Sequence, residues 1–572
     1  MKHKLLTIIA LLLLSNAIAQ QRDHYRVPFD PATVQNENVV AGEIIKCSFN
    51  DSKIYPMTTR DYWIYIPAAY DASKPACLFV CLDGITYNAP TVFDNLIATG
   101  QMPVTIGVFV NPGVVRDSEG GVIRYNRSNE FDRTDGTFAR FLIEELLPDV
   151  ERHTTADGRQ ILLSKDPNDC AIAGSSSGGI CAFSAAWARP DRFGRVFSAV
   201  GTYVSMRGGN EYQAVIRKSE PKPLRIFLQD GLYDVWNGIF GDWYEANILV
   251  ESALNFSGYE VAHNWGRGGH SNTHANRIFP DVMRWLWKGW PQPVRAGRSQ
   301  NDMLEAILPE EGTWERVDGV NVEDKLIAYR DKVVFEKDGK ICNLDGSSIL
   351  RLHRGEHLVG ADATSLYLSN VKNKIIRSQN GIRKEMSTLQ VKVKQLIAAD
   401  KLNCYITYGN EGKTAIAHID SCGNLTVVND GLSCGTSLAL YPDHRLLICN
   451  EPHTRWLLSY IIGEDGQPMA GQRFYWLHNI SGDDSQQVGQ MCFDENGNLY
   501  VATTMGVQVC DQNGRVRAIL SLPDSAPIRS LAFAGTKLYV VNDRGEVYVR
   551  ELKVSGVQVW QSATSPKSQG QG

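Results

Sequence analysis

The chain has 572 residues, a length that is too great for one ordinary hydrophobic core and that predicts two domains. Its 43% hydrophobic and 21% charged residues are typical of a well-packed globular protein and exclude a disordered or fibrous one. The net charge of −5 provides no cationic field, so we expect no nucleic acid and no anionic lipid surface as a partner.

The first residues have the order of a secretion signal. Basic residues precede an apolar run from Leu5 to Leu14, and the small-residue cleavage site Ala17 to Ala19 follows. This run is too short to cross a bilayer, which needs about 20 residues, and no later stretch is long and apolar enough. Residues 1–19 are therefore predicted to be a signal peptide cleaved after Ala19, which implies a secreted or periplasmic protein without a membrane span.

Residues 20–290 alternate short apolar segments with longer segments of helical pattern. Strands are predicted at 61–66, 77–82, 104–110, 170–173, 196–200 and 224–229, and helices at 137–152, 179–187, 243–257 and 278–288. This alternation predicts an α/β fold, in which helices cover both faces of a mainly parallel sheet. Residues 291–300 have the proline and polar content of a linker.

Residues 301–555 have a different texture, with short strands separated by turns that contain an acidic residue or Asn together with Gly. The clearest turns are at 336–339, 420–423, 494–497, 511–514 and 543–545. These residue types tolerate the left-handed backbone conformation of a hairpin turn. So many hairpins predict an all-β propeller, to which we assign six blades. Residues 556–572 lack apolar content and are predicted to be a flexible tail.

The twelve cysteines are scattered along the chain, and many lie inside apolar runs that resemble strands. No pair of them, and no cluster with histidine, has the spacing of a zinc site. We therefore expect most of the cysteines to be small buried hydrophobic residues. The sequence predicts neither a metal nor another cofactor.

The strongest chemical signal is a G-x-S-x-G motif between Gly174 and Gly178. It follows an apolar strand and opens a helical segment, which is the context of a nucleophile elbow that exposes a hydroxyl at a helix N-terminus. Ser175 and Ser177 compete for the role, but only Ser176 has glycine at both required offsets. Ser176 is therefore the predicted nucleophile.

A serine nucleophile needs a histidine base that a carboxylate orients, and in this fold the chain order is serine, acid, histidine. Asp230 and Asp234 follow the predicted strand 224–229. We prefer Asp234, which lies in the loop after a glycine, and keep Asp230 as the alternative acid that caps the turn. His270 follows two glycines and is the predicted base, whereas His274 is a candidate for a substrate contact or a helix cap.

A tetrahedral intermediate also needs backbone N–H donors. The amide of Ser177 is one candidate, and the amides of Gly84 and Ile85 are candidates for the second, with Asp83 holding their loop. Aromatic rings near this site can stack on sugar or phenolic rings. With His274, the candidate substrate contacts are Tyr87, Trp236 and Trp265.

Several blocks occur in a fixed order over about residues 40–290, namely 59–62, 82–84, 127–132, 144–148, 174–179 and 268–270. They resemble the esterases related to enterochelin esterase and to carbohydrate esterase family one, which contains feruloyl and acetylxylan esterases. The resemblance implies an α/β-hydrolase fold with Ser176, Asp234 and His270 as the catalytic triad. Arg127 and Glu130 are expected to form a structural ion pair at the pocket rim.

Residues 494–502, 506–509 and 511–514 resemble the gluconolactonase (senescence-marker-like) propellers. Those lactonases hold a divalent cation with Asn and Asp side chains, and two of these positions differ here. Thr436 is a poor ligand for a hard cation, and Gly489 has no side-chain oxygen. The resemblance therefore implies a propeller that has lost the metal and the lactonase activity and remains as a glycan-binding or spacing module.

Together these features predict a secreted serine esterase that acts on feruloyl or acetyl esters of a plant polysaccharide or oligosaccharide of the xylan type. A siderophore trilactone esterase is the alternative within the same chemistry, although its anionic substrate favours a basic pocket rim that the sequence does not show. A sugar lactonase that works through the propeller is the second alternative, against which the altered cation positions argue.

Overall fold

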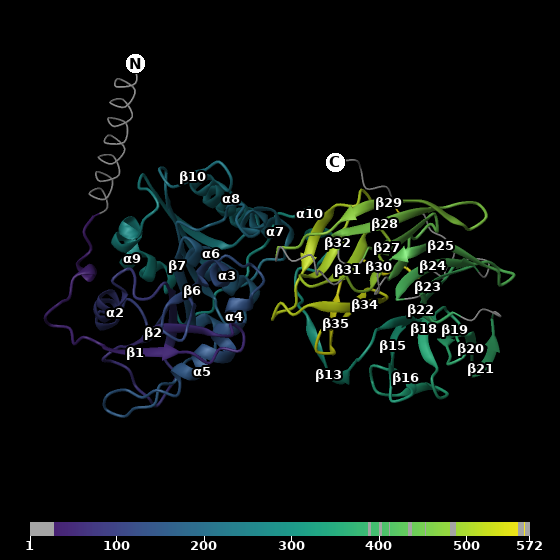
Figure 1. Ribbon diagram of the computed structural model, residues 1–572, viewed down its shortest axis with the longest axis horizontal. Helices are drawn as coiled ribbons and strands as arrows, with labels where there is room; N and C mark the ends of the chain where they lie inside the picture. The colour runs from purple at the N-terminus through teal and green to yellow at the C-terminus, as the bar shows by residue number, and fades with distance from the viewer. Residues whose placement is uncertain are drawn as a thin grey trace, which may run out of the picture. The chain divides into compact units, whose positions relative to one another are not determined.

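The computed structural model describes residues 28–386, 391–399, 403–410, 412–432, 437–451, 454–480, 488–558 and Pro566. The predicted signal peptide, Thr436 and most of the predicted tail lie outside these residues. The chain divides into two compact units (Figure 1). One comprises mainly residues up to Gln300, and the other begins at Asn301.

The first unit is built on one ten-stranded sheet. Its order is β12-β9-β8-β7-β3-β4-β2-β5-β6, with β1 paired to β2. The neighbours from β12 to β4 are parallel, and β2 pairs antiparallel with β1, β4 and β5. The strands are β1 (Glu43–Phe49), β2 (Thr58–Ile66), β3 (Cys77–Leu82), β4 (Thr105–Val110), β5 (Val114–Arg116), β6 (Val122–Tyr125), β7 (Cys170–Ser175), β8 (Arg195–Ala199), β9 (Arg225–Gly231) and β12 (Glu260–Gly266).

All six predicted strands are present, and the prediction of a mainly parallel sheet is confirmed. The strands that the sequence did not predict are β1, β5, β6 and β12. These four strands lack an apolar run because most of their residues remain partly or fully exposed. A separate short hairpin, β10 (Trp236–Asn237) and β11 (Gly241–Asp242), follows β9.

Helices cover both faces of this sheet. The side chains of β3, which point alternately to one face and the other, contact helices on each face. Phe79 and Cys81 pack with α2 and α9 in one hydrophobic cluster. Leu82 points to the other face, where Gly178 of α6 approaches it. The helices are α2 (Ala89–Ala98), α3 (Arg127–Phe131), α4 (Thr137–Phe141), α5 (Leu147–Val150), α6 (Ser177–Ala188), α7 (Tyr212–Lys218), α8 (Trp243–Phe256) and α9 (Asn272–Leu286). The helix predicted at 137–152 is α4 and α5, joined by a widened turn at Leu142–Leu146.

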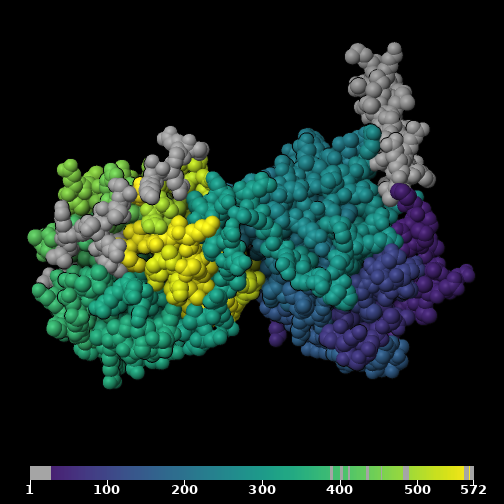
Figure 2. Space-filling view, turned by 180° about the vertical axis from the view of Figure 1, so that it is seen from behind, coloured from purple at the N-terminus to yellow at the C-terminus, as the bar shows by residue number. Residues whose placement is uncertain are grey.

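The second unit opens with α10 (Asp302–Ile307) and forms six four-stranded antiparallel sheets, so the prediction of a six-bladed propeller is confirmed. The last blade pairs β13, near the start of the unit, with β36 at its end, which closes the ring. In Figure 2 the yellow strands of this blade lie beside the teal residues that begin the unit.

Each blade contributes its first strand to the centre of the ring and its later strands to the outside. The first five blades are β14 (Ile327–Tyr329), β15 (Lys332–Lys337), β16 (Lys340–Asn343), β17 (Ser348–Arg351); β18 (His357–Ala361), β19 (Ser365–Ser369), β20 (Ile375–Gln379), β21 (Ile382–Glu385); β22 (Val393–Ala398), β23 (Cys404–Asn410), β24 (Lys413–Ile419), β25 (Leu425–Leu432); β26 (Leu438–Leu440), β27 (Leu446–Asn450), β28 (Trp456–Ile462), β29 (Pro468–Trp476); β30 (Met491–Phe493), β31 (Leu499–Thr503), β32 (Gly506–Cys510), β33 (Val516–Leu520). The sixth is β34 (Ile528–Ala534), β35 (Lys537–Asn542), β36 (Glu546–Glu551) and β13 (Glu315–Asn321).

The five predicted turns each join two neighbouring strands of one blade. The first shows why they need their residues: Asp338 and Gly339 have φ values of 49° and 66° between β15 and β16. Asp tolerates this left-handed region better than most residues, and Gly enters it without steric cost. The hydrogen bonding of the propeller extends beyond residue 555, because the amide of Val557 donates to Phe493 O at 2.9 Å.

Eleven of the twelve cysteines lie in the described part of the chain. All eleven are free thiols, and nine of them are buried. This confirms the expectation that most cysteines are small buried hydrophobic residues. Among the described residues, no helix has the length and apolar character of a membrane span.

Candidate active site

Ser176 lies between the end of β7 and the start of α6, with φ 59° and ψ −123°. A positive φ in a non-glycine residue costs about 1–3 kcal/mol and persists only where neighbouring structure enforces it. Here the amide of Ser176 donates to Ala199 O at 2.9 Å. The glycines of the motif make the tight turn possible, because a Cβ on Gly174 would lie 2.4 Å from the carbonyl of Gly178.

Substitution of Gly174 by alanine is expected to lower the rate of serine labelling by a phosphonate at least 100-fold. The added Cβ must push α6 away from β7, and a displacement of about 1 Å at a reacting group costs about 10²-fold in rate. Gly409→Ala is the control, because its added Cβ meets only Lys394 at 3.8 Å. Equal labelling rates in the two variants would contradict the strained elbow.

Ser176, His270 and Asp234 lie in one chain of hydrogen bonds. His270 Nε2 is 2.8 Å from Ser176 Oγ, and His270 Nδ1 is 2.6 Å from Asp234 Oδ1. The Asp234 side chain is fully buried, and 29% of the His270 side chain is exposed. The three residues follow β7, β9 and β12, whose parallel order brings their carboxyl ends to one edge of the sheet. The structure thus brings together the three residues that the sequence predicted.

Asp230 occupies a different position from Asp234. It lies inside β9 and is completely buried, and its carboxyl oxygens accept from Gly231 N at 2.6 Å and from Asn247 Nδ2 at 2.8 Å. Burial, together with the neighbouring Asp234 carboxylate, raises the pKa of Asp230 to about 10. The raised pKa favours the protonated form of Asp230, while its neighbour Asp234 contacts His270.

Two of the predicted backbone donors have no acceptor of their own among the described residues. Within the described residues, the amides of Ser177 and Ile85 donate to no acceptor, whereas the amide of Gly84 donates to Val110 O at 3.3 Å. Of the two predicted amides in the loop after β3, Ile85 is therefore the one available to a ligand.

Asp83 and Arg127 hold the loop that carries Ile85. Arg127 donates from Nε and Nη2 to the two Asp83 oxygens at 2.7 and 2.8 Å, and Nη2 also lies 3.4 Å from Ser175 O. Asp83 and Gly84 have φ values of 65° and 78°, so the turn is a tight one that this bidentate pair stabilises.

The predicted ion pair between Arg127 and Glu130 is wrong. Both residues lie on α3, but Glu130 points into the interior and binds Arg60 at 2.6 and 3.0 Å, with both side chains fully buried. Arg127 instead binds Asp83. The partners are 70 and 44 positions apart, so no local pattern indicated either pair.

The structure buries two of the four candidate substrate contacts. Tyr87 is 1% exposed, stacks on Phe279 and lies 2.6 Å from Ser175 Oγ. His274 is buried on α9, with Nδ1 3.3 Å from Gln229 Nε2.

The other two candidates are tryptophans with different surroundings. Trp265 is half-buried, stacks on His263 and donates to Glu251 at 3.2 Å. Trp236, two residues after Asp234, is 73% exposed. Of the four candidates, Trp236 therefore presents its ring most openly.

Thr202 and Trp243 complete the surroundings of the nucleophile. Thr202 Oγ1 lies 3.4 Å from Ser176 Oγ and accepts from Trp243 Nε1 at 3.2 Å, while the Trp243 ring meets the His270 ring edge-on. Sequence reasoning missed Thr202. The only available signal was its position just after the predicted strand 196–200.

The fold and the site define a class: an α/β domain with a serine at a strand-to-helix elbow and with histidine and aspartate in hydrogen-bonding order. Residues 57–326 match the family model Esterase, described as "Putative esterase". Residues 402–542 match the model of the SMP-30/Gluconolactonase/LRE-like region. The chain thus joins an esterase-like segment to a gluconolactonase-like propeller, and the first match supports a carboxylic-ester hydrolase.

A curated relative is the iron(III) enterobactin esterase of Dickeya dadantii (strain 3937), which is 25% identical over 260 residues. The match covers 42% of this chain and 54% of that protein, so the chain spans about half the length of this relative.

Three solved structures are similar in part. An enterobactin esterase from Shigella flexneri is 22% identical and a ferulic acid esterase 17% identical, with TM-scores of 0.34 and 0.33. The match to the enterobactin esterase covers 46% of this chain and 63% of that structure. The match to the ferulic acid esterase covers 44% of this chain and 99% of that structure. A gluconolactonase from Xanthomonas campestris is 16% identical, with a TM-score of 0.37 and coverage of 44% and 93%.

The divalent cation that a gluconolactonase-like propeller implies does not fit the residues present here. No carboxylate is among the described residues that line the channel, and its polar side chains are Lys325, Gln395, Gln490 and Gln558. Gly489 offers no side-chain oxygen, and Thr436 lies outside the described residues. A lysine amine repels a cation, so the described part of this channel does not supply the donor set of a calcium-type site.

Proposed function

We propose that the first unit is a serine carboxylic-ester hydrolase that works through an acyl-enzyme. The observation that carries this proposal is the hydrogen-bond chain from Ser176 Oγ through His270 to Asp234, at 2.8 and 2.6 Å. A serine hydroxyl is a weak nucleophile, and a histidine held in the right tautomer by a buried carboxylate makes it reactive.

The proposed reaction has two halves. Ser176 attacks the ester carbonyl while His270 Nε2 takes its proton, and the amides of Ile85 and Ser177 donate to the developing oxyanion. His270 then protonates the departing alcohol, which leaves an acyl group on Ser176. A water molecule, deprotonated by His270, attacks this acyl group and releases the acid.

The proposed substrates are feruloyl or acetyl esters of a plant polysaccharide, met outside the cytoplasm. Large apolar side chains stand exposed in the loop that carries Asp234: Leu232 is 50%, Trp236 73% and Ile239 82% exposed. Such side chains can stack on sugar or phenolic rings of a substrate that extends beyond the site. The signal-like N-terminus supports export to the periplasm or the medium.

A siderophore trilactone is the second candidate substrate, and the similarity to an iron(III) enterobactin esterase favours it. A catecholate substrate is anionic and calls for cations around the nucleophile. Arg127, which reaches Ser175 O, is neutralised by Asp83. This pairing makes the polysaccharide ester our first choice.

The test measures release of ferulate and of acetate from arabinoxylan fragments, and hydrolysis of enterobactin, by the chain without residues 1–19. Ser176→Ala is the matched variant, and it is expected to abolish both ester release and labelling by a serine-directed phosphonate. Ferulate release that disappears in this variant would support a feruloyl esterase, and acetate release alone a deacetylase. Turnover that survives Ser176→Ala would overturn the serine mechanism.

A further inference from the structure

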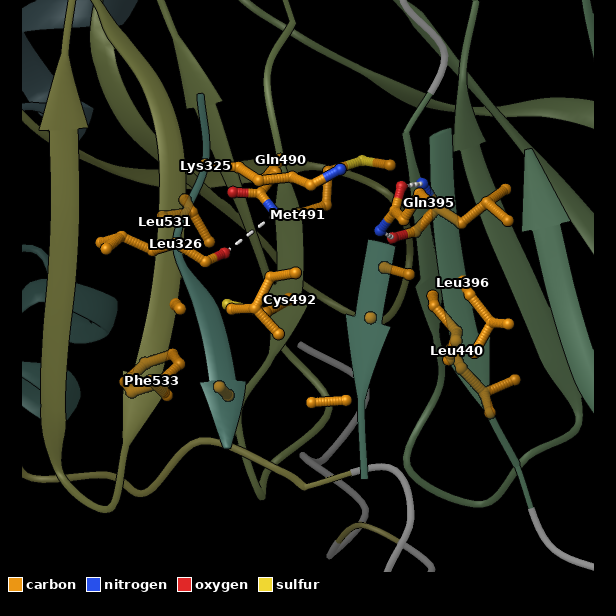
Figure 3. A pocket seen from close by; sticks show the side chains of 18 of the residues that line it. Lys325, Leu326, Gln395, Leu396, Leu440, Gln490, Met491, Cys492, Leu531 and Phe533 are labelled. Carbon is orange, nitrogen blue, oxygen red and sulfur yellow. Dashed lines mark hydrogen bonds between the residues drawn. The ribbon is translucent and has the colours of Figure 1, made fainter. Parts of the chain in front are cut away.

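The propeller encloses a channel along its axis, lined by the first strands of all six blades. The volume of this cavity is about 130 Å³. The first strands of all blades begin at the same end of the channel. We call this end the starting end, and the end where these strands stop the finishing end. Figure 3 shows Lys325, Gln395 and Gln490 at the starting end and Phe533 towards the finishing end.

Val557 and Gln558 lie at the finishing end. Val557 donates from its amide to Phe493 O at 2.9 Å, and Gln558 Nε2 lies 3.4 Å from Phe533 O. Both Val557 and Gln558 line the channel. The side-chain oxygen of Gln558 is buried and has no hydrogen-bond partner among the described residues, and Gln558 is 9% exposed. A buried polar atom of this kind usually has a partner, so it points to a ligand or water in the channel.

The side chains along the wall between the two ends are apolar. Figure 3 shows Leu396, Leu440, Met491 and Phe533 along it. No carboxylate and no hydroxyl group is among the described residues that line the channel. These side chains offer a sugar hydroxyl no hydrogen-bond partner, so they favour a molecule with an apolar body.

The starting end carries the cation Lys325, whose nearest acceptor among the described residues is a neutral carbonyl. Lys325 Nζ donates to Lys394 O at 2.5 Å, and the Asp324 carboxylate lies 3.8 Å away with 71% of its side chain exposed. Burial lowers the pKa of Lys325, because the charged amine loses water without gaining a buried counter-charge. An anion at this end would supply that counter-charge.

Two glutamine amides are held in place beside Lys325. Gln490 Nε2 donates to Leu326 O at 3.2 Å while its oxygen accepts from Ser530. Gln395 Nε2 donates to Leu438 O at 3.0 Å, and its oxygen accepts from Leu438 N at 2.8 Å. Each amide group has two N–H bonds, so each retains a second N–H donor for a ligand. The end thus offers N–H donors around a single positive charge.

We propose that the propeller channel binds a small monocarboxylate with an apolar body, its carboxylate at Lys325 and its body along Leu396, Leu440 and Met491. One lysine balances one negative charge, whereas a doubly charged phosphate would keep an unpaired charge in a buried site. The cation site of the gluconolactonase-like fold is thereby replaced by an anion site. The acid that an esterase releases belongs to this chemical class, but the proposal does not depend on the esterase reaction.

The experiment uses the full mature chain carrying Ser176→Ala and titrates it calorimetrically with ferulate, octanoate and gluconate. We expect ferulate or octanoate to bind at least tenfold more tightly than gluconate. Adding Lys325→Met should weaken the binding at least tenfold, whereas Lys325→Arg, which keeps the charge, should change it less than threefold. Lys340→Met, at an exposed position on β16, is the matched control and should have no effect.

Circular dichroism of each variant establishes that the propeller is folded before its affinity is compared. The proposal is overturned by affinity that does not depend on Lys325, by preferred binding of gluconate, or by no binding at millimolar ligand. Each of these results would leave the esterase proposal standing, because no turnover is measured here. Conversely, a result that contradicts the esterase proposal would not change how binding depends on Lys325.

Discussion

Asp234→Asn is expected to lower kcat about 10⁴-fold, whereas Asp230→Asn should leave kcat within about threefold of the parent chain. An asparagine at 234 offers an amide where His270 Nδ1 needs a carboxylate, and it favours the wrong histidine tautomer. An asparagine at 230 is neutral, as a protonated Asp230 is, and it keeps an oxygen that can accept from Asn247 Nδ2. Steady-state hydrolysis of an activated acetate ester measures both effects.

Asp230 also makes the stability of the folded chain depend on pH. The folded chain holds the proton of Asp230 up to a pKa of about 10, while the unfolded chain releases it near 3.8. Between these values the folded state binds more protons, so the free energy of unfolding contributed by Asp230 falls as pH rises. Asp230→Asn removes this dependence, so its melting temperature relative to the parent should rise from pH 5 to pH 9.

The reverse pattern would identify Asp230 as the catalytic acid: kcat lost in Asp230→Asn and kept in Asp234→Asn. Asp242→Asn is a suitable control, because this carboxylate caps α8 through Glu245 N at 3.0 Å and does not contact the histidine. It should lower stability by about 1 kcal/mol or less and leave kcat unchanged.

Arg60→Met is expected to lower the free energy of unfolding of the first unit by about 3–5 kcal/mol. Arg60 and Glu130 have fully buried side chains joined at 2.6 and 3.0 Å, and the arginine also lies 4.2 Å from the Phe141 ring centre. Removing the arginine leaves a buried carboxylate with Gly113 N and Asn126 Nδ2 as its remaining donors. Urea unfolding followed by tryptophan fluorescence measures the loss.

Two further variants separate the buried charge from the lost volume. Arg60→Met combined with Glu130→Gln should recover part of the stability, because no unpaired charge then remains. Arg140→Met is the exposed control: Arg140 and Glu144 lie 3.8 Å apart on one helical stretch and are more than half exposed. Its expected effect is below about 0.5 kcal/mol, and an Arg60→Met effect of the same size would contradict the structural role.

Features that depend on near neighbours in the chain were predictable. Buried parallel strands such as β3 are continuous apolar runs, and the elbow at Ser176 needs glycine two residues away on each side. The hairpin turns of the propeller depend on residues such as Asp338 and Gly339 that accept positive φ. The exposed strands β5 and β6 escaped prediction, because a strand that buries little carries no apolar pattern.

The sequence by itself determined two domains of different class, the elbow with its nucleophile, and the order of acid and base along the chain. Only the tertiary structure decided which aspartate contacts His270, which cation holds Asp83, and that Tyr87 and His274 are buried. The reason is physical: these relations join residues 36 to 88 positions apart, and the order of strands in the sheet sets such distances. The lysine at the start of the propeller channel is of the same kind, since Lys325 Nζ donates to Lys394 O, 69 positions away.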